Sequence, residues 1–144
     1  MDVLPEFYGT SVVVETPFAP CDEEIRLVSQ SGNGWTENDS RLAIEARNKK
    51  YLHACLLDCM RNGEAPYASH LFFTQFLDDT QPSERTAGMN AGMVWGEKAS
   101  KCVIYGDCGI TEGMRKGAAH YKTLGLIVEY RYLYGDMSHV EASI

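Results

Sequence analysis

The sequence has no apolar run that approaches the roughly 20 residues needed to cross a bilayer as a helix. It also has no basic excess, because 13 Lys and Arg stand against 20 Asp and Glu and give a formal net charge of −7. Scattered basic residues in an acidic chain argue against a surface that neutralises many phosphates of duplex nucleic acid. We therefore expect neither a membrane nor duplex nucleic acid as a partner.

A secretory leader is not expected either, because the first residues lack a basic segment followed by an apolar core. We therefore expect a cytoplasmic protein. Five cysteines are an odd number at irregular spacing, which favours reduced and mostly buried thiols over a disulfide framework. Cys55 and Cys59 lie four residues apart, but no further pair has ligand-like spacing, so core packing is favoured over a metal site. We expect no metal and no cofactor.

The composition, with 44% hydrophobic and 23% charged residues, is typical of one globular domain over residues 1–144. β-branched runs predict strands at residues 10–15, 101–105 and 126–130, and a weaker one at 65–69. Caps and helix formers predict helices at about 41–61, 82–98 and 111–124, whereas 71–77 fits either a helical turn or a buried loop. This order predicts an α/β fold: a single three-layer Rossmann-like domain with a four- to five-stranded parallel sheet.

Two segments have no clear periodicity. Residues 21–38 are rich in acids, Ser, Gly and Asn, and predict a long loop that can include a short helical turn at 22–28. Such a loop serves as a lid or contact surface, or is a floppy connector. Residues 132–144 are expected to form a C-terminal tail.

Candidate ligand-binding residues follow the predicted strands, because ligands of open parallel sheets bind beyond the carboxyl ends of the strands. Glycines at the start of the last helix add backbone N–H groups and a helix dipole that favour an anion, although a tight structural turn explains them equally well. These candidates are Thr16, Pro17, Phe18, Ser69, His70, Asp107, Gly109, Ile110, Gly113 and Met114.

Asp78 and Asp79 precede the helix predicted from Pro82, near Arg85. Adjacent acids at this place serve either as caps or as acceptors for sugar hydroxyls and base edges, with Arg85 pairing an acid or a phosphate. Aromatic residues nearby, among them Phe18 and Tyr67, provide either a stacking wall or core packing.

Residues 63–92 and 103–133 resemble a phage and bacterial domain family related to nucleoside 2-deoxyribosyltransferases. The pattern comprises Pro66, Ser69-His70-Leu71, Leu77-Asp78-Asp79, Pro82-x-Glu84-Arg85, Gly109-Ile110-x-x-Gly113-Met114 and a terminal Glu129-x-Arg131. The opening departs from the family, since Thr16-Pro17-Phe18 stands where relatives carry Ser-Pro-Tyr. The resemblance implies a nucleoside 2-deoxyribosyltransferase-like sheet and a nucleoside or nucleotide pocket, completed by a neighbouring subunit in a homo-oligomer. A phage-encoded protein would act in the host cytoplasm.

The same resemblance implies a glutamate nucleophile four residues after Gly113, where this chain has Gly117. The supporting aspartate would fall near Gly92 or Met93, which are also non-ionisable. Cleavage of an N-glycosidic bond needs a carboxylate to stabilise an oxocarbenium-like state. The candidates to replace it are Asp78, Asp79, Asp107 and Glu112.

Three functions follow from these observations. The missing nucleophile favours a protein that binds a nucleotide-derived small molecule without turnover, such as a phage protein that sequesters a cyclic or ADP-ribose-derived signal of host immunity. The alternative is an N-glycosidic hydrolase or a 2-deoxyribosyltransferase-like enzyme with a relocated carboxylate. A third hypothesis is a scaffold or interaction protein, because a fold does not fix a function.

Overall fold

The computed structural model describes residues 3–6 and 9–135. Its elements are β1 (Ser11–Glu15), α1 (Asp22–Ser29), α2 (Glu37–Arg61), β2 (Ala65–Tyr67), α3 (Ser69–Phe73), α4 (Pro82–Gly96), β3 (Lys101–Tyr105), α5 (Glu112–Thr123) and β4 (Ile127–Arg131). The predicted strands are confirmed, with small differences at their ends. The long helix begins earlier than predicted because Thr36 and Asp39 form a capping box.

The four strands form one parallel sheet in the order β2-β1-β3-β4. β1 lies between β2, where Ser11 is opposite Ala65, and β3, where Val12 is opposite Lys101. β4 pairs with β3, and Tyr105 is opposite Arg131 at the end of that pair. Among the residues described, the predicted α/β class with a four-stranded parallel sheet is confirmed, and its topology is compatible with a Rossmann-like fold.

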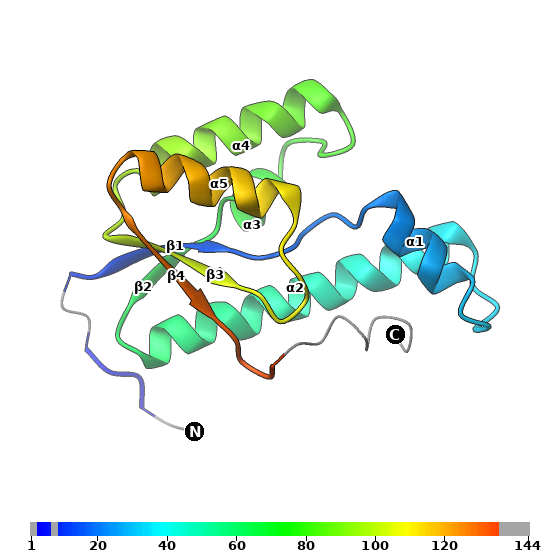
Figure 1. Ribbon diagram of the computed structural model, residues 1–144, viewed down its shortest axis with the longest axis horizontal. Helices are drawn as coiled ribbons and strands as arrows, with labels where there is room; N and C mark the ends of the chain where they lie inside the picture. The colour runs from blue at the N-terminus through cyan, green and yellow to red at the C-terminus, as the bar shows by residue number, and fades with distance from the viewer. Residues whose placement is uncertain (1–2, 7–8, 136–144) are drawn as a thin grey trace.

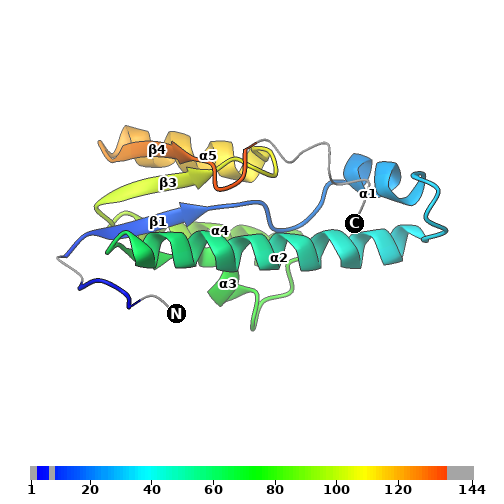
Figure 2. The ribbon, with the colours of Figure 1, turned by 90° about the horizontal axis from the view of Figure 1, so that it is seen from below.

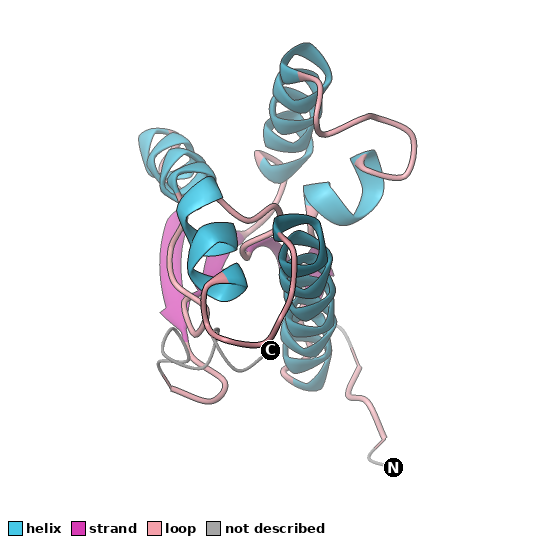
Figure 3. Ribbon diagram, turned by 90° about the vertical axis from the view of Figure 1, so that its right-hand side faces the viewer, coloured by secondary structure: helices cyan, strands magenta, loops and turns pink. Residues whose placement is uncertain are grey.

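Helices cover both faces of the sheet, because successive side chains of a strand point to opposite faces. Val12 and Val14 of β1 pack in a core with Leu52 of α2. Val13 packs on the other side with Ala118 of α5. Figure 1 shows α4 beside α5, and Figure 3 shows the helices on either side of the strands. The expected three layers are therefore present.

Residues 21–38 contain α1, which confirms the helical turn predicted at 22–28 and extends it to Ser29, and residues 30–36 form the loop between α1 and α2. Ile25 and Val28 of α1 are buried against Ile44 of α2. The Cys21 Sγ accepts a hydrogen bond from the Glu24 backbone N–H at 3.4 Å and caps the helix. The eight residues include three apolar ones, of which Leu27 is exposed, so the pattern is weak and only the packing against α2 makes this segment identifiable as a helix.

Helix α4 packs on its neighbours along one edge, here called the glycine edge, which consists of Gly88, Gly92 and Gly96. A Cβ atom at Gly92 would lie 2.4 Å from the Ser69 Cβ, and one at Gly88 would lie 3.3 Å from Leu77 Cδ1. A Cβ at Gly96 would lie 2.1 Å from the Tyr121 hydroxyl of α5. This glycine edge therefore makes contacts within the chain and is not an exposed surface for a second copy.

An ion network ties the start of β2 to β3 and β4. Arg131 donates from two nitrogens to the Glu64 carboxylate, each at 2.7 Å, and Lys101 Nζ lies 2.8 Å from Glu64 Oε2. Glu129 also pairs with Arg131. The Arg131 hydrogen bonds lower the pKa of the buried Glu64 to about 2. The Glu-x-Arg pattern noted in the sequence thus has a structural role.

Four cysteines are buried, as predicted, whereas Cys21 is exposed. Over the part of the chain that the structure describes, no three His, Cys, Asp or Glu side chains are arranged to hold a metal ion. No helix within residues 3–6 and 9–135 has the length and apolar character that a membrane span requires.

Candidate functional site

The candidate site lies where the strand order reverses, between β1 and β3. From β1 the chain proceeds to β2 on one side and then returns past β1 to β3 on the other. Ligands of open parallel sheets bind beyond the carboxyl ends of the strands at such a reversal. Figure 2 shows β1 and β3 pointing toward the same edge. The loops after Glu15 and Tyr105 therefore both begin at this edge, here called the carboxyl edge.

Two of the predicted loops meet at the carboxyl edge. The Thr16 hydroxyl lies 3.1 Å from His70 Nε2, and the ring centroids of Phe18 and His70 are 5.3 Å apart. Thr16 and Pro17 are buried. Asn48 of α2 donates a hydrogen bond to the Phe18 carbonyl at 2.8 Å, which fixes the loop against that helix. The structure thus brings His70 together with Thr16 and Phe18, although His70 lies 54 residues after Thr16 in the sequence.

The imidazole of His70 is mostly withdrawn from water. Burial lowers the pKa of His70 to about 4, because the charged ring would lose its hydration. At neutral pH the ring is therefore uncharged. One ring nitrogen can donate a hydrogen bond and the other can accept one. Such a ring suits a hydroxyl group or the edge of a heterocycle.

A cavity of about 50 Å³ lies beside His70, between α3 and α4. Ser69, Asp79 and Arg85, all predicted site residues, line it together with His70. Desolvation raises the pKa of Asp79, and the nearby charge of Arg85 opposes that shift. The cavity is much smaller than the roughly 300 to 1,000 Å³ of pockets that enclose drug-sized ligands. It has room for one small polar group, so a larger ligand would extend outside it.

Asp78 and Glu112 have local roles at the starts of helices. Asp78 accepts hydrogen bonds from the Thr80 backbone N–H at 3.0 Å and from its hydroxyl at 2.6 Å, and the hydroxyl bond is the main cause of its lowered pKa. Glu112 is exposed in the first turn of α5, where the helix dipole stabilises an acidic side chain. Asp78 thus acts as a turn cap, the structural alternative considered from the sequence.

Asp107 is fully buried and its carboxylate is used within the chain. It accepts hydrogen bonds from the Leu133 backbone N–H at 2.9 Å, the Tyr134 N–H at 2.8 Å and the Tyr51 hydroxyl. Tyr132 also packs on the loop, because a Cβ at Gly106 would lie 2.7 Å from its ring. The first residues of the expected tail thus cover the end of β3, and residues 136–144 lie outside the described part.

The loop and helix start after β3 have mainly structural contacts. Gly109 has φ of +88°, a left-handed conformation that favours glycine. Ile110 and Met114 pack in the core on the α5 side. Thr111 caps α5 by accepting a hydrogen bond from the Met114 N–H at 3.2 Å. Around Gly113 the space is open, since a Cβ there would meet only the Thr111 hydroxyl, at 3.9 Å.

The sequence reasoning missed Glu15, the last residue of β1. Its carboxyl is partly buried, and the cost of desolvation raises the pKa of Glu15 to about 8. The carboxyl lies on the α5 side, where a Cβ at Gly117 would come within 2.7 Å of Glu15 Oε1. A carboxyl thus lies beside the position where the resemblance implies a glutamate. The signal in the sequence is an acid that ends the apolar run Ser11–Glu15 at the carboxyl edge.

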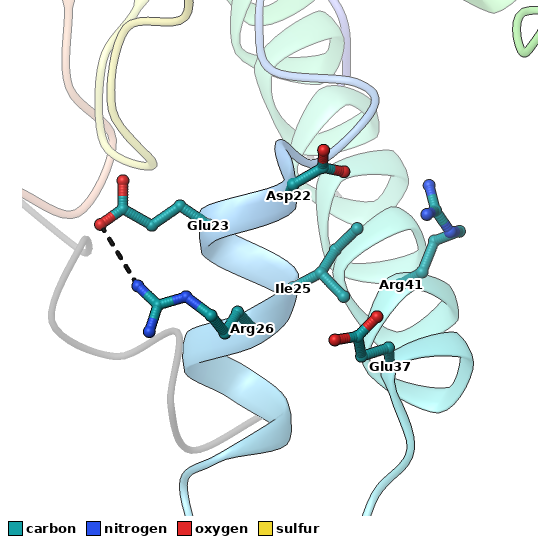
Figure 4. Close-up of a pocket in the computed structure, with 6 residues that line it drawn as sticks. All are labelled: Asp22, Glu23, Ile25, Arg26, Glu37 and Arg41. Carbon is teal, nitrogen blue, oxygen red and sulfur yellow. Dashed lines mark ion pairs between the residues drawn. The ribbon is translucent and has the colours of Figure 1, made fainter.

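A second hollow is an open groove of about 530 Å³ between the first turns of α1 and α2. Figure 4 shows the exposed ion pair of Glu23 and Arg26, 3.7 Å apart, on one side and Arg41 on the other. Its charged side chains point into solvent, and Ile25 is the one apolar residue among those that line it. The groove therefore has the character of a solvated surface.

The fold and the carboxyl edge define the class: an α/β protein with an open parallel sheet and a candidate site at the reversal of strand order. Residues 40–131 match the family described as "Domain of unknown function (DUF7768)", and the chain belongs to that family. No curated protein and no solved structure matches the chain. The matched range contains His70, Arg85 and Gly117, whereas Glu15 and Thr16 precede it.

Proposed function

We propose that the protein binds a nucleoside- or nucleotide-derived small molecule at the carboxyl edge without converting it. The observation that carries this proposal is the convergence of Thr16, Phe18 and His70 at the end of β1, where the strand order reverses. An aromatic ring beside a neutral imidazole and a hydroxyl suits a base or a sugar. Ser69 and Arg85 line the adjoining cavity and suit a polar group such as a phosphate.

Binding without turnover is favoured over catalysis because Gly117 replaces the nucleophile that the resemblance implies. Of the proposed acids, Asp78 and Asp107 accept hydrogen bonds within the chain, and Glu112 is exposed in the first turn of α5. In a phage, this activity would sequester a cyclic or ADP-ribose-derived signal of host immunity. Capture at nanomolar concentration needs about −12 kcal/mol of binding free energy. A homo-oligomer, in which a second copy encloses the part of the ligand outside the small cavity, is part of the proposal.

A release experiment tests this proposal. The protein is incubated with nucleosides, nucleotides, cyclic dinucleotides and ADP-ribose derivatives, freed of unbound compound, heated and analysed by chromatography. We expect one compound to be released intact. Retention of none of them contradicts binding and favours a scaffold, and a free base contradicts capture without turnover. Thermal unfolding is an independent readout, since a ligand at 100 times its Kd adds about 2.7 kcal/mol to stability.

Hydrolysis of an N-glycosidic bond is the second candidate function, and the partly buried Glu15 carboxyl favours it. A protonated carboxyl can donate its proton to the leaving base while water adds to the sugar carbon, and the carboxylate then accepts the proton lost by that water. Glu15→Gln should then abolish release of the free base with little change in binding. If Glu15→Gln, Asp78→Asn, Asp79→Asn, Asp107→Asn and Glu112→Gln all retain turnover, a carboxyl at these positions is not responsible.

A further inference from the structure

Two polar groups on the α5 side of the sheet have no partner among the residues that the structure describes. The Glu15 carboxyl makes no hydrogen bond or ion pair, and burial is the cause of its raised pKa. The hydroxyl of Tyr67 is buried and has neither a donor nor an acceptor within reach. Fully buried polar groups in proteins are nearly always paired, so the Tyr67 hydroxyl is an exception that indicates an absent partner or a functional use. The Glu15 carboxyl is only partly buried, so it can reach a bound molecule.

The two groups belong to neighbouring strands and to the same face. Tyr67 of β2 is opposite Val13 of β1, and Glu15 follows Val13 by two residues, which returns its side chain to that face. Both groups also lie close enough to Tyr121 of α5 for their charges to raise the pKa of the Tyr121 hydroxyl. Glu15, Tyr67 and Tyr121 therefore surround one region between the sheet and α5.

Gly117 determines the space that the Glu15 carboxyl occupies. A Cβ at residue 117 would lie 2.7 Å from Oε1 and 3.1 Å from Cδ of Glu15, and both distances are shorter than an ordinary contact. A larger residue on α5 would therefore displace the carboxyl. The glycine allows an acid of β1 to lie directly against the helix.

Among the residues that the structure describes, no cation balances this carboxyl. Cys102 of β3 is opposite Val13 and so lies on the same face as Glu15, and burial, followed by the Glu15 charge, raises the pKa of the Cys102 thiol. Neither Lys nor Arg stabilises the charged form of Glu15. The carboxyl is therefore protonated at neutral pH and acts as a hydrogen-bond donor toward solvent. A phosphate is not favoured here, whereas an uncharged acceptor is.

We propose that the Glu15 carboxyl and the Tyr67 hydroxyl, on the α5 side of neighbouring strands and unpartnered among the described residues, recognise the nucleobase by hydrogen bonds to its edge. This inference rests on the proposed function and adds which part of the molecule binds where. The base lies on the α5 side of β1, and the phosphate or sugar lies toward His70 and Arg85.

The test uses protein labelled with ¹³C at the glutamate side-chain carboxyls, in which Glu15→Gln assigns the Glu15 signal. Adenosine, guanosine, cytidine and ribose 5-phosphate are added separately, and the His70 ring signals are recorded as well. We expect one nucleoside to shift the Glu15 signal and raise its titration midpoint, while ribose 5-phosphate leaves it unchanged. A nucleoside that shifts the His70 signals alone overturns this inference but not the proposed function. If no compound moves any signal, this inference is wrong, and the release experiment with the wider panel decides separately whether the proposed function holds.

Variants provide a second readout, with the bound nucleoside as the probe. Glu15→Ala should weaken its affinity at least tenfold, whereas Glu15→Gln keeps a donor and should stay within about threefold. Tyr67→Phe should weaken binding severalfold without lowering stability, because the hydroxyl has no partner among the described residues. Glu45→Gln on α2, across the sheet, is the matched control and should change nothing. Equal affinity of Glu15→Ala and the parent protein contradicts the inference.

Gly117→Ala tests the geometry while preserving the fold. Alanine is favoured over glycine inside a helix, and Glu15 can swing aside, so the helix should remain intact. The methyl group should nevertheless displace the carboxyl, lower its titration midpoint toward the ordinary range and weaken nucleoside binding. An unchanged Glu15 signal in Gly117→Ala would show that the carboxyl does not lie against α5.

Discussion

Glu15 illustrates how a single residue can be ordinary in sequence and unusual in structure. It ends an apolar strand, where an acid commonly marks the return of the chain to water. The fold instead places its carboxyl between the sheet and α5, beside Gly117 and with no partner in the described ranges 3–6 and 9–135. The sequence gives the residue type and its place at a strand end, but burial depends on α5, which is distant in the chain.

Glu15 should make the protein less stable as pH rises. Its pKa is about 8 in the folded protein against an ordinary 4.5, so the folded state holds a proton that the unfolded state releases between these values. The contribution is fully present below pH 4.5 and declines as pH approaches 8, by at most about 5 kcal/mol at 1.4 kcal/mol per pKa unit. Cys102, Tyr67 and Tyr121 surround the group and titrate at higher pH.

The measurement for Glu15 is urea unfolding of the parent protein and of Glu15→Gln between pH 5 and 9. The variant should lose most of the decline in this range. A parallel decline in both proteins would mean that the Glu15 carboxyl titrates normally. Glu45→Gln serves as the control and should follow the parent protein.

His70→Ala and Arg85→Ala should each weaken binding of the released compound about tenfold without unfolding the chain. His70 contacts Thr16 and the Phe18 ring, and Arg85 is an exposed residue lining the neighbouring cavity, so neither supports the main core. Isothermal titration gives the affinities, and far-ultraviolet circular dichroism gives the fold. Parental affinity in both variants would remove these residues from the site.

At the scale of elements, α4 shows why small residues are ambiguous in a sequence. Ala87, Gly88, Ala91 and Gly92 allow close approach of another backbone, but the pattern does not identify the neighbour. In the structure, the glycine edge of α4 packs on α3 and on Tyr121. The same ambiguity affected α1, whose helical character depends on its contact with α2.

Gly92→Ala should destabilise the protein by about 1 to 3 kcal/mol, the range for overpacking a close contact. The added methyl would lie 2.4 Å from the Ser69 Cβ and 2.8 Å from its hydroxyl, so α3 and α4 must separate. Gly113→Ala is the control, since open space surrounds that position, and should be close to neutral. Urea unfolding measures the stability of both variants. Equal stability of Gly92→Ala and Gly113→Ala would contradict the packing of α4 on α3.

Gly113 also tests the anion hypothesis at the start of α5. If a phosphate approached the backbone at Gly113, Gly113→Val would weaken its binding, because the added side chain would block that approach. The open space around its Cβ gives no steric reason for a loss of stability. We therefore expect Gly113→Val to fold normally, and its affinity alone then reports whether the ligand approaches α5.

At the scale of the whole molecule, the parallel sheet and its helices were predictable because β-branched runs alternate with capped helices. The convergence of Thr16 with His70 followed from the rule that loops meet at the carboxyl edge. The covering of the β3 end by Tyr132 and the pairing of Arg131 with Glu64 did not follow, because they join segments that no local pattern relates.

Arg131→Met should lower the free energy of unfolding by about 3 kcal/mol, because it leaves the buried Glu64 carboxylate with Lys101 alone. The pKa of Glu64 is about 2 in the folded protein, below its ordinary 4.5. The stabilisation is therefore present above pH 4.5 and is lost as pH falls toward 2. Urea unfolding at pH 7 and pH 3 should show a difference that shrinks at pH 3. An equal difference at both values would exclude this electrostatic origin.

The central claim is that a nucleotide-derived molecule binds at the carboxyl edge, and crystals soaked with the compound that the protein releases on heating test it most directly. The account predicts electron density beyond the ends of β1 and β3, with the base toward Glu15 and the polar group toward Arg85. Density in the groove between α1 and α2, or a carboxyl edge closed by the chain's own side chains in the presence of that compound, would contradict it.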